Sequence, residues 1–153
     1  ETLLIGLYET SDPGNLGTIL RTADAVGAHG VLLVGNTVDP FHPSVVKASA
    51  GTIFTVPLIK IATLPDLVTW CQARGLHIIA STDKADASYW ELDYPQPSVV
   101  LMGAEALGLP PEFLATQPYK VRIPMHGAAD SLNLGVATAL ILYEIKRRRQ
   151  SVS

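Results

Sequence analysis

The sequence predicts an α/β domain with a mainly parallel six-stranded sheet and helices on both of its faces. Two observations carry this prediction. Short apolar segments that are typical of buried strands recur along the chain, and segments with helical spacing of apolar residues lie between them. The chain also has 153 residues, of which 48% are hydrophobic and 16% charged, so it is long enough and apolar enough for one domain with its own core.

The first half of the chain predicts three strands and three helices. The strands are expected at residues 3–8, 31–34 and 56–61, and the helices at residues 15–26, 44–49 and 64–74. The first strand is apolar enough to lie in the centre of the sheet, whereas Pro57 places the third strand at an edge. In the first helix, apolar residues recur every three or four positions. Asn15 is expected to cap its N-terminus.

The second half predicts strands at residues 77–81, 98–102 and 120–123, a short helix after Pro111, and a long final helix at residues 134–145. The final helix carries apolar side chains on almost its whole circumference. A helix of this kind is usually buried on more than one side, and a chain of this size offers too few other elements to surround it. We therefore expect a homodimer that forms through the C-terminal helix.

Composition and charge exclude several classes of protein. The net charge of −3 rules out a polycation, so binding of nucleic acid requires a local basic patch. The basic run at residues 146–149 either forms such a patch or is a solvated tail whose cations suit a helix C-terminus. Cys71 is the single cysteine, which excludes an internal disulfide and favours a reducing, cytoplasmic location. No apolar run is long enough to span a membrane, and the histidines lack metal-ligand spacing, so neither a membrane nor a metal is expected.

Familiar catalytic motifs are absent. The turn after the first strand lacks the glycine pattern of dinucleotide sites, and Leu109-Pro110 stands where a phosphate-binding loop requires lysine and a hydroxyl residue. The histidine, aspartate and serine within residues 126–131 are too close in sequence for a hydrolytic triad. The loop at residues 82–97 contains three aromatic residues, Tyr89, Trp90 and Tyr94. They either stack on a base or cover a sheet edge, and we favour the second role.

Five polar residues are expected to meet at one edge of the sheet, at the C-terminal ends of the first, fifth and sixth strands. They are Asn15, Arg21, Glu105, Ser131 and Asn133. Open α/β sheets place their sites at this edge, and Gly17 is expected to leave open space beside the arginine. Taken singly, each residue has a plain interpretation as a helix cap, a surface cation or a solvated loop charge. Together they indicate a binding site for a polar, anionic ligand, without naming a reaction.

Three motifs resemble those of a known family. Residues 15–22 match the pattern N-x-G-x-x-x-R-T, residues 103–109 match G-x-E-x-x-G-L, and residues 123–133 match I-P-M followed by S-L-N. Ala48-Ser49-Ala50-Gly51 also fits a segment of this family. In order and spacing the chain resembles, over nearly its whole length, the SpoU/TrmH family of RNA ribose 2′-O-methyltransferases in the SPOUT superfamily.

This resemblance implies a fold and a cofactor. Members of the family have an α/β-knot, in which the C-terminal segment passes through a loop and forms a trefoil knot, an exception to the rule against knots. Their cofactor, S-adenosyl-L-methionine (AdoMet), lies bent in the knot and is held largely by backbone groups of three loops. The corresponding residues of this chain are Thr82, Gly103, Ile123, Met125, Ser131 and Leu132.

The resemblance also implies a chemistry. Arg21 corresponds to the catalytic arginine of the family, assisted by Asn15, Glu105, Ser131 and Asn133. An arginine is a poor general base because its pKa exceeds about 12. We expect Arg21 to hold an RNA phosphate and to polarise the 2′-hydroxyl. Family members are homodimers with the active site near the interface, so Arg21 is able to act beside the cofactor of the partner subunit.

The expected function is therefore AdoMet-dependent 2′-O-methylation of ribose in a structured RNA, with rRNA favoured over tRNA. The alternative is an RNA-binding or assembly module with a vestigial cofactor pocket. Residues 1–153 are expected to form the catalytic domain, with an upstream RNA-binding domain missing or removed, because family members often carry one and the chain enters a strand soon after Glu1. In one departure from the family, Leu134-Gly135 stands where Val-Ser is common, and Gly135 is expected to lower stability more than activity.

Overall fold

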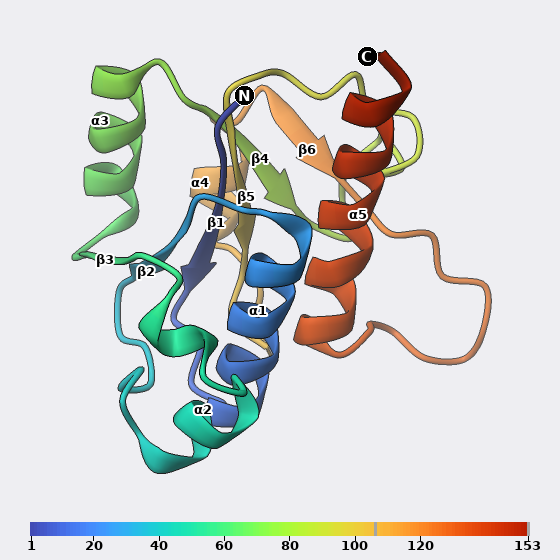
Figure 1. Ribbon diagram of the computed structural model, residues 1–153. Helices are drawn as coiled ribbons and strands as arrows, with labels where there is room; N and C mark the ends of the chain where they lie inside the picture. The colour runs from blue at the N-terminus through green and yellow to red at the C-terminus, as the bar shows by residue number, and fades with distance from the viewer. Residues whose placement is uncertain (106, 153) are drawn as a thin grey trace.

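The computed structural model describes residues 1–105 and 107–152 and contains a six-stranded sheet (Figure 1). Ala106, in the second motif, lies outside the described residues. The strands are β1 Leu3–Tyr8, β2 Gly30–Val34, β3 Leu58–Ile61, β4 His77–Ser81, β5 Ser98–Met102 and β6 Tyr119–Val121. Their order across the sheet is β3-β2-β1-β5-β4-β6, and neighbouring strands are parallel. The predicted parallel sheet, the central first strand and the edge position of the third strand are thus confirmed.

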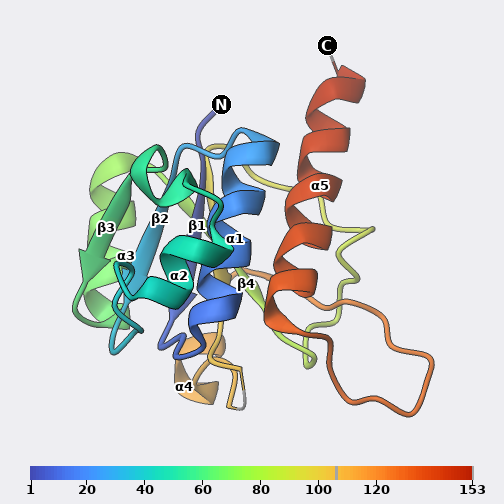
Figure 2. The same cartoon turned by 60° about the horizontal axis from the view of Figure 1, so that its bottom comes forward.

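Helices cover both faces of the sheet, as predicted. They are α1 Pro13–Val26, α2 Pro43–Ala48, α3 Leu64–Arg74, α4 Pro111–Leu114 and α5 Leu134–Val152, with a 3₁₀ turn, η1, at Thr52–Phe54. Helices α1, α2 and α5 lie on one face, and α3 lies with α4 on the other (Figures 1 and 2). Because the strands run in the same direction, the loops that follow them open at one edge, the lower edge in Figure 1. None of the helices in the described ranges is long and apolar enough to cross a membrane.

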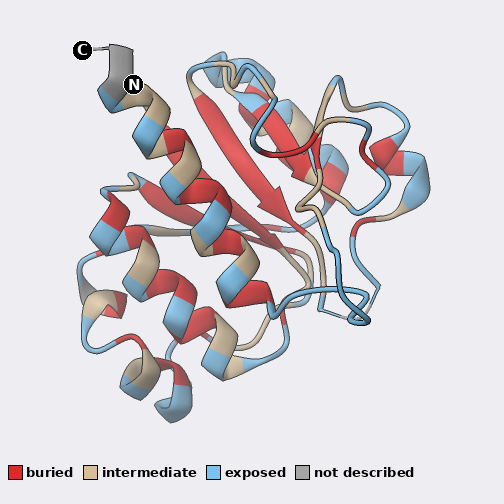
Figure 3. Ribbon diagram, turned by 90° about the vertical axis from the view of Figure 1, so that its right-hand side faces the viewer, coloured by how far each residue is buried: buried red, intermediate tan, exposed pale blue. Residues whose placement is uncertain are grey.

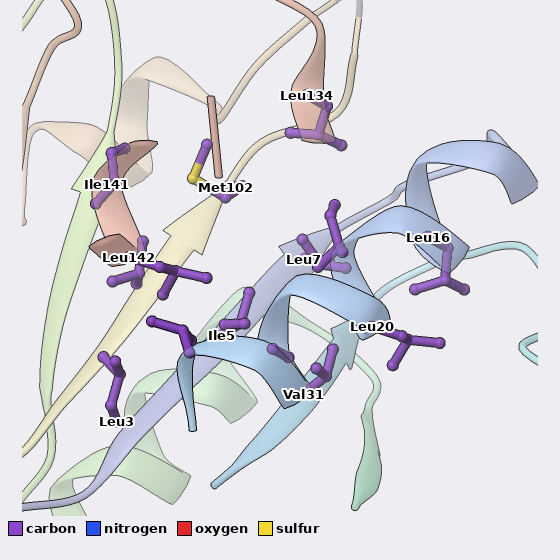
Figure 4. Close-up of a cluster of buried hydrophobic side chains, with 14 of the residues drawn as sticks. Leu3, Ile5, Leu7, Leu16, Leu20, Val31, Met102, Leu134, Ile141 and Leu142 are labelled. Carbon is purple, nitrogen blue, oxygen red and sulfur yellow. The ribbon is translucent and has the colours of Figure 1, made fainter. Parts of the chain in front are cut away.

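The core consists of two apolar layers, because alternate residues of a strand point to opposite faces of the sheet. Leu3, Ile5 and Leu7 of β1 belong to the layer that packs on α1 and α5, whereas Leu4 belongs to the layer under α3 and α4. Figure 4 shows the first layer, and Figure 3 shows the buried strands behind α1 and α5, whose outer surfaces are partly exposed. Both faces of the sheet are therefore buried, and this packing holds the sheet in place. The loops that follow the strands lie at its lower edge.

Helix α1 starts earlier than predicted, and its cap is Asp12 rather than Asn15. Asp12 Oδ1 accepts hydrogen bonds from the backbone N–H groups of Gly14 and Asn15, at 2.8 and 3.1 Å. Pro13 occupies the start of the helix, where its ring presets a helical φ and its missing N–H is not needed. The side chain of Asn15 is thereby available for contacts outside its own helix.

Gly17 does not leave open space beside Arg21, contrary to the prediction. Helix α2 fills that space: a Cβ at Gly17 would lie 2.4 Å from Ala48 Cβ and 2.9 Å from the carbonyl oxygen of Val45. Glycine therefore permits the close approach of α1 and α2. The periodicity of α1 puts Gly17 away from its apolar stripe, but it does not indicate which element covers it.

The two edge strands are shorter than predicted. Strand β3 begins at Leu58, and β6 ends at Val121. Beyond β6, Arg122 forms an isolated bridge with Ser88, and its N–H donates to the Ala87 carbonyl at 2.9 Å. The 82–97 loop thus continues the sheet edge where the strand was expected to run on.

The aromatic residues of this loop have different environments. Tyr89 is buried in the core layer under α5, and Tyr94 packs against that layer. The Tyr94 hydroxyl donates a hydrogen bond to the Tyr89 carbonyl, and burial raises the pKa of Tyr94 above its ordinary value. Trp90, in contrast, is 55% exposed. The favoured covering role therefore fits Tyr89 and Tyr94, but not Trp90.

Helix α5 extends past its predicted end and includes the basic run, which contacts the body of the protein. Lys146 Nζ donates to the Val26 carbonyl at the end of α1, at 3.3 Å, and Arg149 donates to the Glu1 carbonyl at 2.9 Å. Arg148 donates to the carbonyls of Trp90 and Leu92. The interpretation as a solvated tail is wrong for these three cations, which bind backbone carbonyls of neighbouring segments, whereas Arg147 is exposed and pairs with Glu144 of its own helix.

Candidate active site

A cavity of about 360 Å³ lies at the lower edge of the sheet, where β4, β5 and β6 end and α5 begins. A volume of this size is typical of small-molecule sites. Three segments supply most of its lining: residues 81–84 after β4, residues 102–105 with 107–109 after β5, and parts of residues 123–134 between β6 and α5.

The six residues predicted to bind a cofactor all line this cavity. They are Thr82, Gly103, Ile123, Met125, Ser131 and Leu132. They belong to three loops that are far apart in the sequence. The sheet brings these loops together because β4 lies between β5 and β6 and the three parallel strands end at the same edge.

The loop after β5 folds back tightly on itself at two glycines. The N–H of Gly108 donates to the Ala104 carbonyl at 2.9 Å, and Gly108 has a φ of +66°, a conformation that L side chains rarely adopt. A Cβ at Gly103 would lie 2.4 Å from the carbonyl carbon of Gly108 and 2.6 Å from the nitrogen of Leu109. Only glycine at position 103 allows this backbone-to-backbone contact, so the motif spacing is a steric requirement of the cavity wall.

Two hydrogen bonds of Thr82, one from its backbone and one to its side chain, hold the turn after β4. Its N–H donates to the Val121 carbonyl at 2.9 Å, which joins the end of β4 to the end of β6. Its Oγ1 accepts from the N–H of Lys84 at 3.2 Å. This wall of the cavity is therefore formed by ordered backbone.

Asn15 and Asn133 join the first and third motifs. Asn133 Nδ2 donates to Asn15 Oδ1 at 3.0 Å, across a sequence separation of 118 residues. Asn133 Oδ1 accepts from the N–H of Val136 at 3.2 Å, so Asn133 caps α5. A Cβ at Gly135 would lie 3.2 Å from Thr18 Cγ2. Gly135, at which the sequence departs from the family pattern, therefore suits the close approach of α5 to α1.

Glu105 and Ser131 occupy the border of the cavity. Glu105 Oε1 accepts from the N–H of Asp12 at 3.3 Å, which links the second motif to the start of α1. Ser131 lines the cavity and is exposed, and the cap of α5 is Asn133 rather than Ser131. Four of the five predicted catalytic residues therefore lie around the joined N-terminal ends of α1 and α5.

Arg21 is the exception among the five. It is exposed on α1 and is not among the residues that line the cavity. Within the described part of the chain, its guanidinium makes no hydrogen bond or ion pair with another residue. The predicted cation is therefore not aimed into the cavity of its own chain.

The charge of the cavity differs from the prediction of an anionic ligand. Its charged side chains, among the described lining residues, are the acids Asp83, Glu105 and Asp130 and the base Lys84. Acidic side chains favour a ligand that carries positive charge. In the described ranges, no three His, Cys, Asp or Glu side chains gather closely enough to hold a metal ion.

The sequence did not indicate the buried apolar part of the lining. Met102, Leu109, Leu114 and Leu134 line the cavity, and each is also largely buried in the core. Their side chains give no signal that distinguishes the wall of a pocket from ordinary packing. Lys84 and the neighbouring Asp83 were missed for the opposite reason, because an exposed charged pair in a loop is typical of a solvated turn.

Residues 2–143 match the SpoU rRNA Methylase family. The chain belongs to this family. It is 38% identical over 147 residues to an uncharacterized tRNA/rRNA methyltransferase, slr1673, of Synechocystis sp. The aligned region covers 96% of this chain and 54% of that relative. It is 35% identical over 146 residues to the 23S rRNA (uridine(2479)-2'-O)-methyltransferase of Streptomyces viridochromogenes. Here the aligned region covers 92% of this chain and 51% of the relative. The chain thus spans about half the length of these relatives.

Solved SpoU-family structures have the same fold. The AdoMet-bound rRNA methyltransferase from Sinorhizobium meliloti superposes with a TM-score of 0.91 at 42% identity, over 96% of this chain and 56% of that chain. A structure that concerns the 2-OH methylation of C/U34 on tRNA gives a TM-score of 0.91 at 29% identity, over 98% of this chain and 97% of that chain. The resemblance stated from the three motifs is therefore confirmed.

Proposed function

We propose that residues 1–153 form the catalytic domain of an AdoMet-dependent RNA ribose 2′-O-methyltransferase. One observation carries the proposal: the six residues assigned to the cofactor line a single cavity, although they come from three separate loops. The S. meliloti relative that was solved with AdoMet supports the same ligand. When bound, AdoMet supplies a methyl group on a sulfonium, whose positive charge suits the acidic residues at the cavity.

The proposed roles follow from position. Thr82, Gly103 and Leu132 offer backbone groups to the cofactor, while Ser131 and Glu105 stand at the border of the cavity. Asn15 and Asn133, hydrogen-bonded to each other, keep the N-terminal ends of α1 and α5 in register. Arg21 holds an RNA phosphate and polarises the 2′-hydroxyl, so that transfer depends mainly on orientation and charge.

Arg21 reaches a cavity through dimerisation. It is exposed on α1 and is not part of the cavity of its own chain. Helix α5 packs beside α1 and contributes Leu134 and Ala137 to the cavity. A second copy seated on α5 therefore brings its own arginine towards this cavity, and the reaction is shared between two subunits.

The exposed face of α5 supports this dimer. One side of α5 packs on the core of its own chain, because Ile141, Leu142 and Ile145 are buried. A second copy is therefore needed only to cover the side that remains exposed. Val136, Leu140 and Tyr143, spaced along one face, are 50%, 38% and 47% exposed. We assign this stripe to the interface with the second copy.

Leu140→Arg is expected to convert the dimer into a monomer, because a charged side chain replaces an apolar contact in the middle of the stripe. AdoMet affinity is expected to fall as well, since α5 forms part of the cavity wall. Light scattering and calorimetric titration measure the two effects. Ile59→Arg is the matched control, because Ile59 is also 38% exposed but lies on edge strand β3. A wild-type chain that is monomeric at micromolar concentration contradicts the interface.

The knot of the family is also proposed for this chain. The segment between β6 and α5 lines the same cavity as the loops after β4 and β5, which suits a threaded path. Stretching the chain by its two ends would then tighten the knot and stop short of the full extension of about 3.5 Å per residue. Full extension would contradict the knot.

The proposed substrate is rRNA, with tRNA as the second choice. The S. viridochromogenes relative is a 23S rRNA methyltransferase, whereas another matched structure concerns methylation of tRNA. The alternative function is an RNA-binding module with a vestigial pocket, acting in the same cytoplasmic setting.

Calorimetric titration of the chain with AdoMet separates the two functions. The enzyme is expected to bind one AdoMet per cavity with a micromolar dissociation constant, which corresponds to about −8 kcal/mol. No binding at millimolar AdoMet would overturn the enzyme and favour the vestigial pocket.

A further inference from the structure

We propose that the turn before α2 is an RNA contact, in which Phe41 stacks on an unpaired base near the ribose to be methylated and Lys47 binds a neighbouring phosphate. The inference rests on the proposed function, because it names how the same site holds its substrate. Phe41 is 60% exposed. Exposed aromatic side chains beside cations are the usual means of holding single-stranded RNA without reading its sequence.

The turn presents Phe41 in a defined position. Asp39 Oδ1 accepts from the N–H of Phe41 at 2.9 Å, and the Asp39 carbonyl accepts from the N–H of His42 at 3.0 Å. His42 Nδ1 in turn accepts from the N–H of Ser44 at 3.1 Å and caps α2. Pro40 is buried beneath the turn. The backbone at Phe41 is therefore fixed, so only the side-chain torsions of the ring have to be ordered when a base stacks on it.

The turn lies at the same edge of the sheet as the cavity. It follows β2, and β2 is parallel to the strands whose ends form the cavity. The N–H of Val38 donates to the Thr10 carbonyl at 2.8 Å, which ties the turn to the loop between β1 and α1. Asp12 of that loop donates to Glu105 at the border of the cavity. These contacts therefore fix the turn relative to the N-terminal end of α1, the helix that carries Arg21.

Helix α2 connects Phe41 to Arg21. The helix packs on α1 at Gly17, which lies one turn before Arg21. Since a helix rises about 1.5 Å per residue, the turn at the start of α2 lies within roughly 15 Å of that contact. Arg21 lies four residues further along α1, about 6 Å away, so one strand of RNA is able to reach both residues.

The charge of this surface suits RNA. Lys47 is exposed near the end of α2, and Arg21 is exposed on α1. Asp39 of the turn is exposed and keeps its negative charge while it accepts a backbone hydrogen bond, so the positive charge of the surface comes from Lys47 and Arg21 together. Helix α2 lies on the side of α1 opposite α5 (Figure 2), so the turn before α2 and Lys47 are separate from the apolar stripe assigned to the second copy. An RNA strand is therefore the occupant that both the ring and the cations favour.

Binding of a fluorescent single-stranded oligouridylate to the full chain tests this inference. Phe41→Ala is expected to weaken binding about tenfold, as for the loss of one stacked base. Phe41→Trp is expected to restore it, because indole keeps the π-face, whereas Phe41→Leu is not. Lys47→Ala is expected to lower the slope of log affinity against log salt by about 0.7, the effect of one phosphate contact. Ile59→Ala is the matched control and is expected to bind like the wild type.

The outcomes separate this inference from the proposed function. AdoMet affinity is measured on the same variants and is expected to be unchanged by Phe41→Ala. If the wild type binds AdoMet but Phe41→Ala or Phe41→Leu binds the oligouridylate as well as the wild type, the stacking contact is overturned and the enzyme stands. If the wild type does not bind the oligouridylate, the contact is also overturned. If the wild type does not bind AdoMet, the proposed function is overturned instead.

Discussion

Arg21→Ala is expected to abolish methyl transfer to RNA, by at least about 100-fold, while AdoMet affinity stays within about threefold of the wild type. The reason is position: Arg21 is exposed on α1, away from the residues that line the cavity of its own chain. Its guanidinium is assigned to the phosphate and hydroxyl of the RNA, which only the transition state engages fully. Transfer of a labelled methyl group and calorimetric titration measure the two quantities separately.

Arg74→Ala is the matched control for this variant. Arg74 is also an exposed arginine, but it lies at the end of α3 with its guanidinium 4.1 Å from the ring centroid of Trp70. Methyl transfer by Arg74→Ala is expected to equal that of the wild type. Equal losses of transfer and of AdoMet affinity in Arg21→Ala would contradict the assigned role.

Mixing Arg21→Ala with Gly103→Ala, at an AdoMet concentration too low to fill the altered cavity, tests whether Arg21 acts on the partner subunit. In a mixed dimer of Arg21→Ala with Gly103→Ala, one site combines an intact cavity with an intact arginine from the other chain. Part of the activity is therefore expected to return on mixing. A mixture as inactive as its components would place arginine and cavity in one chain.

Gly103→Ala is expected to lower AdoMet affinity at least about tenfold and to destabilise the protein by about 1–3 kcal/mol. Its Cβ would meet backbone atoms of Gly108 and Leu109 at 2.4 and 2.6 Å, which have no flexible side chain to move aside. The loop after β5 must therefore shift, and the cavity wall shifts with it. A decrease in melting temperature of about 2–4 °C per kcal/mol is expected for a chain of this length.

Gly127→Ala is the control for this substitution. Gly127 lies in the segment between β6 and α5, and nothing stands within 4 Å of the position its Cβ would take. Its AdoMet affinity and melting temperature are expected to match the wild type. A Gly103→Ala variant that behaves like Gly127→Ala would show that the loop after β5 does not shape the cofactor site.

Much of the fold could be predicted from local patterns. The apolar first strand indicated a central position, and Pro57 indicated that β3 lies at an edge; both follow from rules about hydrogen bonding and burial. The cap of α1 was misassigned because Asp12 and Asn15 are both good capping residues, and only the position of Pro13 decides between them. The neighbour of Gly17 could not be predicted, because periodicity describes one helix at a time.

The candidate site was predicted from motifs rather than from periodicity. The contact between Asn15 and Asn133 joins residues 118 positions apart, and no local rule indicates it. The apolar lining residues were missed because they also serve as core. The exposed position of Arg21 depends on how α2 and α5 pack around α1, which is a property of the assembled fold.

The position of the transferred methyl group distinguishes ribose 2′-O-methylation from methylation of a base. The full chain is incubated with ribosomal RNA and AdoMet carrying an isotope-labelled methyl group, and the RNA is then digested to nucleosides for mass spectrometry. We expect the label on the 2′-oxygen of a ribose, and we expect Arg21→Ala to leave the RNA unlabelled. Label on a base, or label that persists in Arg21→Ala, would contradict this expectation.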